Sequence, residues 1–215
     1  MSYDISDLMA KSMVNMAAER PMEYLFVWTT LAALSPSLPA DRDRVRVLDV
    51  GGADSRLART LAELGFDVTV IDVLDVDHGR ARFVRANILE HDFPEEHFDV
   101  IIAISTIEHV GLPAYGQKVL DPDGDTKAMG KLYRWLKRGG FAILTVPYGK
   151  PHHPPDFERV YNKETLAKRI LSGGWEVVSA LYVCQHAVWQ PCTRETAEER
   201  DSCACLLLRK PGVVP

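Results

Sequence analysis

The chain has 215 residues, a length that suits one folded domain with a substantial hydrophobic core. Hydrophobic residues make up 47% and charged residues 26%, which is ordinary for a globular protein and excludes a disordered one. The net charge of −5 and the lack of a lysine- or arginine-rich run argue against a nucleic-acid partner, because phosphate binding needs a basic surface. No apolar run reaches the roughly 18 to 20 residues that span a bilayer, so we expect no membrane partner.

The start of the chain lacks the charged-then-apolar pattern of a secretory signal, so we expect a cytoplasmic protein. The cysteines, at positions 184, 192, 203 and 205, lie in the last quarter, and none has a CxxC spacing. Cys203 and Cys205 share one face of an expected strand, a poor geometry for a disulfide and too few ligands for structural zinc. We therefore expect reduced cysteines that pack as small hydrophobic side chains.

Two helices are expected before the first strand, over residues 4–18 and 21–34. We expect residues 1–40 to form a helical lid or flank and residues 41–215 to form the main domain. A strand at about 45–50 is followed by a helix with leucines at helical spacing, which Gly65 ends as a C-cap.

The rest of the chain alternates strands with helices, which indicates a mostly parallel sheet with helices on both faces. Further strands are expected at about 67–73, 82–86, 98–105, 141–147, 175–183 and 203–209. A helix before Gly139-Gly140, which should end it, and a second helix at about 163–171 separate the later strands. The long, helix-poor connection 184–200 predicts that the last strand of this seven-stranded sheet is antiparallel.

The segment 45–55 has the pattern of a buried strand, a glycine turn and a helix start, and Asp72 closes the next strand. In open α/β sheets these two pieces hold a nucleoside. Glycines let the backbone approach the ligand, and a carboxylate accepts hydrogen bonds from ribose hydroxyls. The sequence therefore predicts a nucleoside site at the ends of the first two strands.

Five motifs, in this order, resemble those of the class I S-adenosylmethionine-dependent methyltransferases. They are VLDVGG at 47–52, VIDV at 70–73, ANILEHDFPEEHFDVI at 86–101, STIEHV at 105–110 and LKRGGFAILTVP at 136–147. The resemblance covers residues 45 to about 182 and implies an α/β fold with a single Rossmann-like domain and S-adenosyl-L-methionine as cofactor. The segments 20–26, 108–125 and 158–166 further resemble a bacterial subgroup linked to sugar and natural-product pathways.

The resemblance assigns cofactor contacts in the first turn. Asp49 matches the acidic residue that faces the methionine amino group, and Gly51 matches the first glycine of the turn. The family pattern then has glycine where this chain has Ala53 and Ser55. Both are small enough for close approach, but neither suits a positive φ, so we expect Gly52 to take that conformation.

The resemblance also assigns contacts along the cofactor. Asp72 matches the carboxylate that holds both ribose hydroxyls, and Val73 would pack on the adenine. Asn87 stands where the family often has an aspartate that accepts from the adenine amine, a role that an amide oxygen can fill. Ile88 would supply a backbone donor to the ring. Ser105 would line the cofactor near its reactive methyl.

Methyl transfer needs alignment of the acceptor and, for a hydroxyl, removal of its proton. His109 is the candidate base because it follows the fourth strand and imidazole titrates near neutrality. A hydrogen bond within its loop is the alternative role, and Glu108 would orient it. His152 and His153 follow the fifth strand, and His153 is a second candidate, although adjacent side chains rarely face one site.

Further residues have open roles. Tyr24 and Arg20 on the second helix are candidate contacts to the cofactor or the acceptor, with core packing as the alternative. The acidic run 121–125 has carboxylates spaced as in calcium loops but lacks their downstream glutamate, so we expect no metal. Asp125 is instead placed to cap the following helix.

The leading hypothesis is an enzyme that methylates an oxygen of a small sugar, hydroxyl or carboxyl acceptor. A nucleic-acid or protein methyltransferase is disfavoured because 105–108 reads STIE rather than an Asn/Asp-Pro-Pro-aromatic run. A nicotinamide-dependent oxidoreductase is disfavoured as well. Its binding turn usually has the pattern G-x-G-x-x-G, and Arg56 occupies the position of the last glycine, where it would crowd the pyrophosphate. A catalytically idle binding module stays open, as does the choice between monomer and homodimer.

Overall fold

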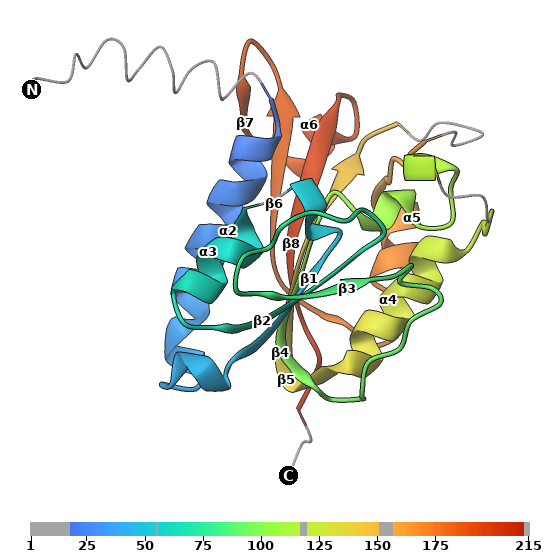
Figure 1. The fold of residues 1–215 in the computed structure, drawn as a ribbon. Coiled ribbons are helices and arrows are strands. Elements are labelled where there is room, and N and C mark those ends of the chain that lie inside the picture. Colours follow the sequence, from blue (N-terminus) through green and yellow to red (C-terminus); the bar gives the residue numbers. More distant parts are fainter. Residues whose placement is uncertain (1–17, 55, 117–119, 151–156, 213–215) are drawn as a thin grey trace, which may run out of the picture.

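A computed structural model describes residues 18–54, 56–116, 120–150 and 157–212, which fold around one eight-stranded sheet (Figure 1). The strands are β1 (Arg46–Val50), β2 (Asp67–Asp72), β3 (Arg82–Arg85), β4 (Phe98–Ile104), β5 (Leu136–Tyr148), β6 (Glu176–Gln185), β7 (Trp189–Cys192) and β8 (Ser202–Arg209). The main helices are α2 (Arg20–Leu34), α3 (Leu57–Glu63), α4 (Gly124–Trp135), α5 (Lys163–Thr165), which continues as a π-helical turn over Leu166–Ile170, and α6 (Arg194–Ala197). Short 3-10 turns include η3 (Gly52–Asp54), η4 (Ile107–His109) and η5 (Ala114–Gly116).

The strand order is β3-β2-β1-β4-β5-β8-β6-β7. The first five strands pair in parallel, and β8 runs antiparallel between β5 and β6, as predicted. The chain moves outward from β1 to β3 and then returns to β4 on the other side of β1. Ligands of open α/β sheets bind where the order reverses in this way, beyond the carboxyl ends of the strands.

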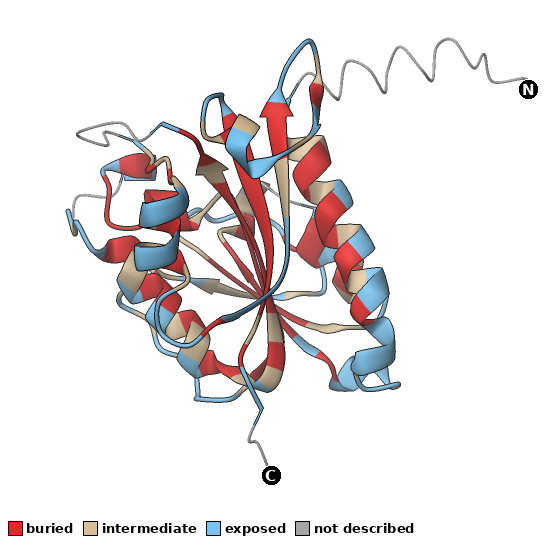
Figure 2. Cartoon of the chain, turned by 180° about the vertical axis from the view of Figure 1, so that it is seen from behind, coloured by how far each residue is buried: buried red, intermediate tan, exposed pale blue. Residues whose placement is uncertain are grey.

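Two hydrophobic clusters hold the layers together, one on each face of the sheet. α4 and α5 cover one face, and α2 and α3 cover the other (Figure 1). Strand β4 serves both, since Ile101 packs into one cluster and its neighbours Val100 and Ile102 into the other. This explains its nearly continuous apolar run. Buried residues accordingly follow the strands and the inner sides of the helices (Figure 2).

Helix α2 confirms the second expected amino-terminal helix, whereas the first, at 4–18, lies outside the described residues. Pro21 occupies its first turn, where no backbone donor is lost. Phe26 and Val27 pack into the cluster shared with α3. The division at residue 40 stays a prediction. No helix in the described part of the chain is long and apolar enough to cross a membrane.

Two local predictions in the region of α4 are wrong. Helix α4 ends at Trp135, so Gly139 and Gly140 lie inside β5. Gly139 has a φ of +78°, and the pairing of β4 with β5 shifts register nearby, so the glycines serve an irregular strand. Asp125 is no helix cap either. Its buried carboxylate accepts hydrogen bonds from the Tyr161 hydroxyl (2.9 Å) and from Arg169 Nη2 (2.6 Å).

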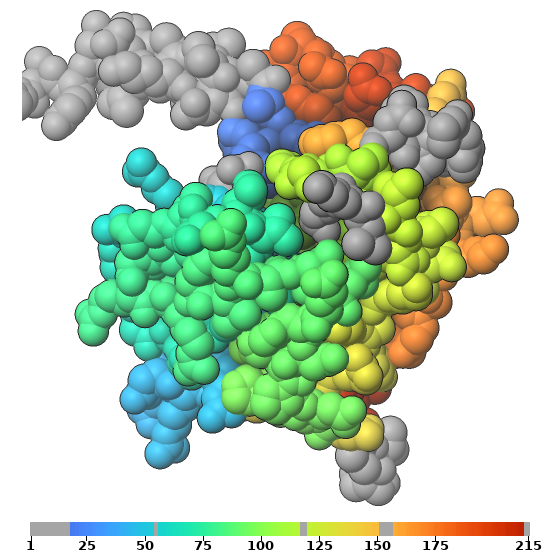
Figure 3. All heavy atoms as spheres, turned by 45° about the vertical axis from the view of Figure 1, so that its right-hand side comes forward, coloured from blue at the N-terminus to red at the C-terminus, as the bar shows by residue number. Residues whose placement is uncertain are grey.

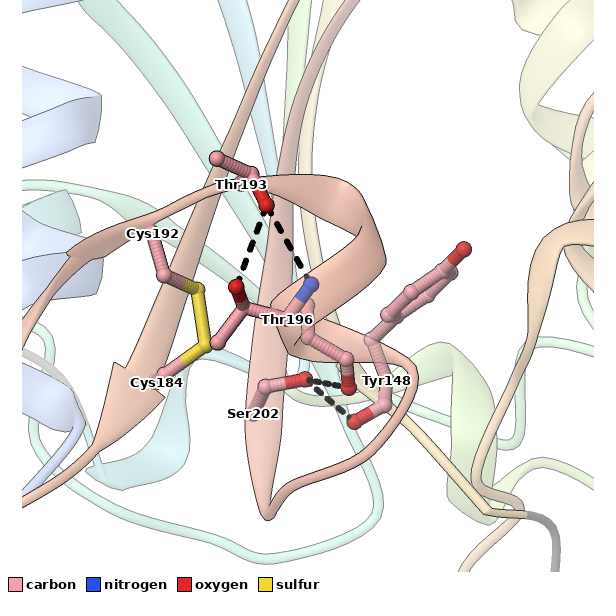
Figure 4. Close-up of a disulfide and its surroundings, with 7 residues drawn as sticks. Tyr148, Cys184, Cys192, Thr193, Thr196 and Ser202 are labelled. Carbon is pink, nitrogen blue, oxygen red and sulfur yellow. Dashed lines mark hydrogen bonds between the residues drawn. A yellow bond between two sulfur atoms is a disulfide. The ribbon is translucent and has the colours of Figure 1, made fainter.

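The expectation of four reduced cysteines is wrong for two of them, because Cys184 and Cys192 form a disulfide with Cα atoms 5.9 Å apart (Figure 4). The short strand β7, an eighth strand that the sequence did not predict, pairs Cys192 with Tyr182. Cys184 lies two positions from Tyr182, and therefore on the same face of β6. Cys203 and Cys205 are free and buried, as predicted.

Candidate active site

A pocket opens beyond the carboxyl ends of β1, β2 and β4, where the strand order reverses. It brings together most of the residues that the sequence singled out. Those that line it are Tyr24, Asp49, Gly51, Ala53, Asp72, Val73, Asn87, Ile88, Ser105 and His109. Gly52 and Glu108 do not line the pocket but directly adjoin residues that do, and His153 lies outside the described residues. Arg20, Thr106 and Tyr115 complete the side of the pocket next to His109.

The turn after β1 needs both glycines, for different reasons. Gly51 has a φ of +71°, and a Cβ atom there would overlap the side chain of Thr106. Gly52 has no positive φ, but a Cβ atom there would lie 2.6 Å from Oδ2 of Asp49. The expectation that Gly52 takes the left-handed conformation is therefore wrong. Gly51 takes it, and Gly52 makes room for the buried carboxylate of Asp49.

Asp72 ties the turn to the end of β2. Its Oδ2 accepts a hydrogen bond from the amide of Ala53 (2.9 Å), and its Oδ1 accepts one from the amide of Leu74 (2.8 Å). Ala53 has no positive φ, so this position does not require the family's glycine. Each carboxylate oxygen has a further lone pair, so the half-buried Asp72 keeps acceptor capacity toward the pocket.

Asn87 and Ile88 form the wall beyond Asp72. The side-chain oxygen of Asn87 accepts a hydrogen bond from the amide of Leu89 (2.9 Å), which fixes the orientation of the amide group. Ile88 is buried and lines the pocket with Val73. The wall therefore combines an apolar surface with an oriented amide, which suits a flat heteroaromatic ring.

Ser105 is held at the floor of the pocket by Glu23, a residue that sequence reasoning missed. The Ser105 hydroxyl and the Thr145 hydroxyl both donate to Oε1 of Glu23, each at 2.5 Å. Ser105 has a φ of +42°, and its amide donates to Thr145 Oγ1 at 3.0 Å. Arg20 forms an ion pair with Oε2 of Glu23 at 3.4 Å. The sequence did contain a signal for Glu23. It lies between the apolar residues Met22 and Phe26, at a spacing that places all three on the buried face of one helix.

A hydrogen bond to the backbone determines which ring nitrogen of His109 carries the proton. Its Nδ1 lies 2.8 Å from the carbonyl oxygen of Phe157, so Nδ1 carries the proton and Nε2 keeps a lone pair. Burial lowers the pKa of His109 from its ordinary value, which keeps the ring neutral at pH 7. Nε2 lies 3.7 Å from Oε1 of Glu108. The buried side chain of Glu108 has no hydrogen bond to other described residues, and burial raises its pKa well above the usual range.

The residues present fit S-adenosylmethionine. The two glycines let the turn pack closely against Thr106 and Asp49, and Asp72 keeps free acceptor positions beside the turn. Asp49 lies at the opposite side of the turn, where a carboxylate suits the cofactor's amino group.

A family model described as a methyltransferase domain matches residues 18–180 of the chain. The chain therefore belongs to this methyltransferase family. It is an S-adenosylmethionine-dependent methyltransferase, with S-adenosylmethionine as the methyl donor. The narrower resemblance to a sugar-pathway subgroup stays a prediction.

Three relatives illustrate the range of the similarity. The ubiquinone biosynthesis O-methyltransferase of Brucella anthropi is 25% identical over 190 residues, covering 78% of this chain and 73% of that protein. A sarcosine dimethylglycine methyltransferase structure from Galdieria sulphuraria superposes with a TM-score of 0.62 at 11% identity, over 90% of this chain and 87% of that one. The structure of the 1,6-didemethyltoxoflavin-N1-methyltransferase of Burkholderia thailandensis superposes with a TM-score of 0.56 at 20% identity. The match covers 98% of this chain and 92% of that one. Such structural likeness shows the fold.

Proposed function

We propose that this methyltransferase acts on a small molecule in a biosynthetic pathway and methylates an oxygen atom of a sugar, hydroxyl or carboxyl acceptor. The observation that carries the proposal is the hydrogen bond between His109 Nδ1 and the Phe157 carbonyl, which leaves Nε2 as a proton acceptor at the pocket. A base is needed for a hydroxyl acceptor. The similarity to an O-methyltransferase of Brucella anthropi supports the same choice.

In this proposal the chain contributes position and proton removal. S-adenosylmethionine supplies an activated methyl group when bound. Asp72, with the turn at Gly51, would hold the ribose, and Asn87 would receive the adenine amine. Nε2 of His109 would accept the proton of the acceptor hydroxyl, and Oε1 of the Glu108 side chain, 3.7 Å away, would face the resulting N–H group.

The test is turnover, measured as S-adenosylhomocysteine release with a panel of small hydroxyl compounds. We expect His109→Gln to lower kcat by at least about 100-fold while S-adenosylmethionine affinity stays the same. His186→Gln, which changes an exposed histidine, is the matched control and should retain full activity. A loss below about tenfold for His109→Gln would contradict its role as the base.

A cytoplasmic location and a monomeric or homodimeric state belong to the same proposal. Because disulfides are rare in the reducing cytoplasm, this location requires that the bond between Cys184 and Cys192 is one of the exceptions or is reduced there. Cell fractionation would test the location, and light scattering of the purified protein would test the oligomeric state.

A further inference from the structure

Four glutamates from three segments form an acidic group around η4. Glu19 precedes helix α2, Glu23 lies in its first turn, Glu108 belongs to η4, and Glu158 follows β5. Their charges act on one another. Glu23, Glu158 and Glu19 all raise the pKa of Glu108, and Glu23 and Glu158 raise that of Glu19. Figure 3 shows the start of α2, in blue, on the same face of the molecule as the yellow-green surface around η5.

The cations in the described part of the chain do not neutralise this group. Arg20 lies 3.4 Å from Glu23, and the other three acidic side chains have no lysine or arginine ion pair among the described residues. Arg159 is buried nearby, but its Nη1 donates to the carbonyls of Glu108 (3.0 Å) and Val110 (2.8 Å), and its Nε faces Asp125 at 3.7 Å. Its charge is therefore directed away from the glutamate carboxylates.

Glu108 shows that the described residues leave this acidic group partly unsatisfied. Its side chain is fully buried, yet neither carboxylate oxygen has a hydrogen-bond partner among the described residues. An unsatisfied buried carboxyl group costs about 1–3 kcal/mol, so such a group in a folded protein needs an explanation. Glu19 agrees with this picture, because burial and its acidic neighbours raise its pKa to about 7.

Aromatic rings border the same place. The ring of His109 lies 4.7 Å from that of Phe157 and 5.3 Å from that of Tyr115, measured between centroids. Tyr115 and Phe157 are 5.6 Å apart and expose 48% and 49% of their surface. Exposed aromatic faces next to carboxylates are the usual surroundings of an organic ammonium group.

We propose that the methyl acceptor carries a positively charged amino group, which binds between the Tyr115–Phe157 rings and the half-buried Glu19 and Glu158 while its hydroxyl faces His109. This rests on the proposed function, since it assumes that the acceptor enters the pocket at His109. A metal ion is the weaker alternative, because the described residues contain no group of three or more ligands placed to hold one.

The test measures binding of two matched pairs of probes to the complex with S-adenosylhomocysteine: glucosamine against glucose, and 2-phenylethylamine against 2-phenylethanol. We expect each ammonium compound to bind at least about tenfold more tightly than its neutral partner, the size of one good cation–carboxylate or cation–π contact. Glu158→Gln and Glu19→Gln should each reduce this preference severalfold. Glu164→Gln, an exposed glutamate on α5, should leave it unchanged.

Proton release gives a second readout that a purely structural role would not move. A bound cation lowers the pKa of a neighbouring carboxyl group, so Glu19, with its pKa of about 7, should release part of a proton at pH 7. The heat of binding of 2-phenylethylamine, which is fully protonated at pH 7, should therefore differ between phosphate and Tris buffers, and Glu19→Gln should remove most of that difference.

Equal or tighter binding of the neutral partners, or no binding of either ammonium probe by a complex that retains S-adenosylhomocysteine, would overturn this inference. Failure to bind S-adenosylhomocysteine would instead overturn the proposed cofactor contacts. Methylation restricted to neutral or anionic acceptors would leave the proposed function standing and refute the ammonium site.

Discussion

The two halves of the pocket differ in how their polar groups are satisfied. In the half beside β1 and β2, Asp72 and Asn87 already accept hydrogen bonds from backbone amides of the chain. In the half beside η4, Glu108 has no hydrogen-bond partner among the described residues, and the pKa of Glu19 is raised to about 7. The first half is preorganised without a ligand, whereas the second contains acidic groups that the described residues leave partly unsatisfied, next to which the proposed ammonium group would bind.

This difference separates what the fold supplies from what is particular to this chain. The preorganised half depends on the glycine turn and the strand ends, which the sequence motifs specify. The acidic half depends on residues from α2, η4 and the segment after β5, which meet only in the folded chain. Changes in the first half should therefore affect cofactor binding, and changes in the second should affect the acceptor.

The largest expected effect comes from adding a methyl group to the glycine turn. Gly51→Ala places a Cβ atom against Thr106 at a φ of +71°, so we expect S-adenosylhomocysteine to bind at least about 100-fold more weakly. Gly130→Ala is the matched control. A Cβ atom there, within helix α4, meets nothing within 4 Å, so binding should be unchanged and stability equal or higher. Calorimetry on both variants would decide, and equal affinities would contradict the assignment of the turn.

A smaller effect is expected from pH. Burial lowers the pKa of His109, and the base must be neutral to accept a proton. We therefore expect kcat to be flat between pH 7 and 8 and to fall, by about tenfold per unit, only below the ordinary histidine pKa of about 6.5. The profile of kcat against pH checks this. If kcat instead continued to rise with pH above pH 7, the base could not have a lowered pKa.

The smallest effect on the pocket is expected from the disulfide. Neither Cys184 nor Cys192 lines the pocket, so Cys192→Ser should change cofactor affinity by less than about twofold. The bond closes a loop with a sequence separation of 8, so its loss should lower the free energy of unfolding by about 2–3 kcal/mol. Thermal unfolding with and without reductant would show this. If reductant still lowered the unfolding temperature of Cys192→Ser, the loss of stability could not be assigned to this disulfide.

Long apolar strands were the most predictable part of the fold. The strand expected at 98–105 is β4 at Phe98–Ile104, because a central strand buried on both faces leaves a continuous hydrophobic run. The glycine turn and Asp72 were predictable for a related reason, since their chemistry is local to two adjacent strand ends.

Features that depend on distant contacts were missed. Strand β7 spans only Trp189–Cys192 and includes Pro191, so it shows no alternating pattern, and the disulfide that depends on it was missed too. Asp125 looked like a helix cap because its partners, Tyr161 and Arg169, lie more than 30 residues away in sequence. The link from Glu23 to Ser105 spans 82 residues and could be found only in the folded chain.

The central claim is that Asp72 holds the ribose of S-adenosylmethionine across the turn at Gly51. Titration calorimetry of S-adenosylhomocysteine into the wild-type chain and into Asp72→Ala tests it most directly. We expect clear binding by the wild type and a loss of at least about 100-fold, or about 2.7 kcal/mol, in the variant. Unchanged affinity in a folded Asp72→Ala protein, or no binding heat with the wild type, would contradict the account.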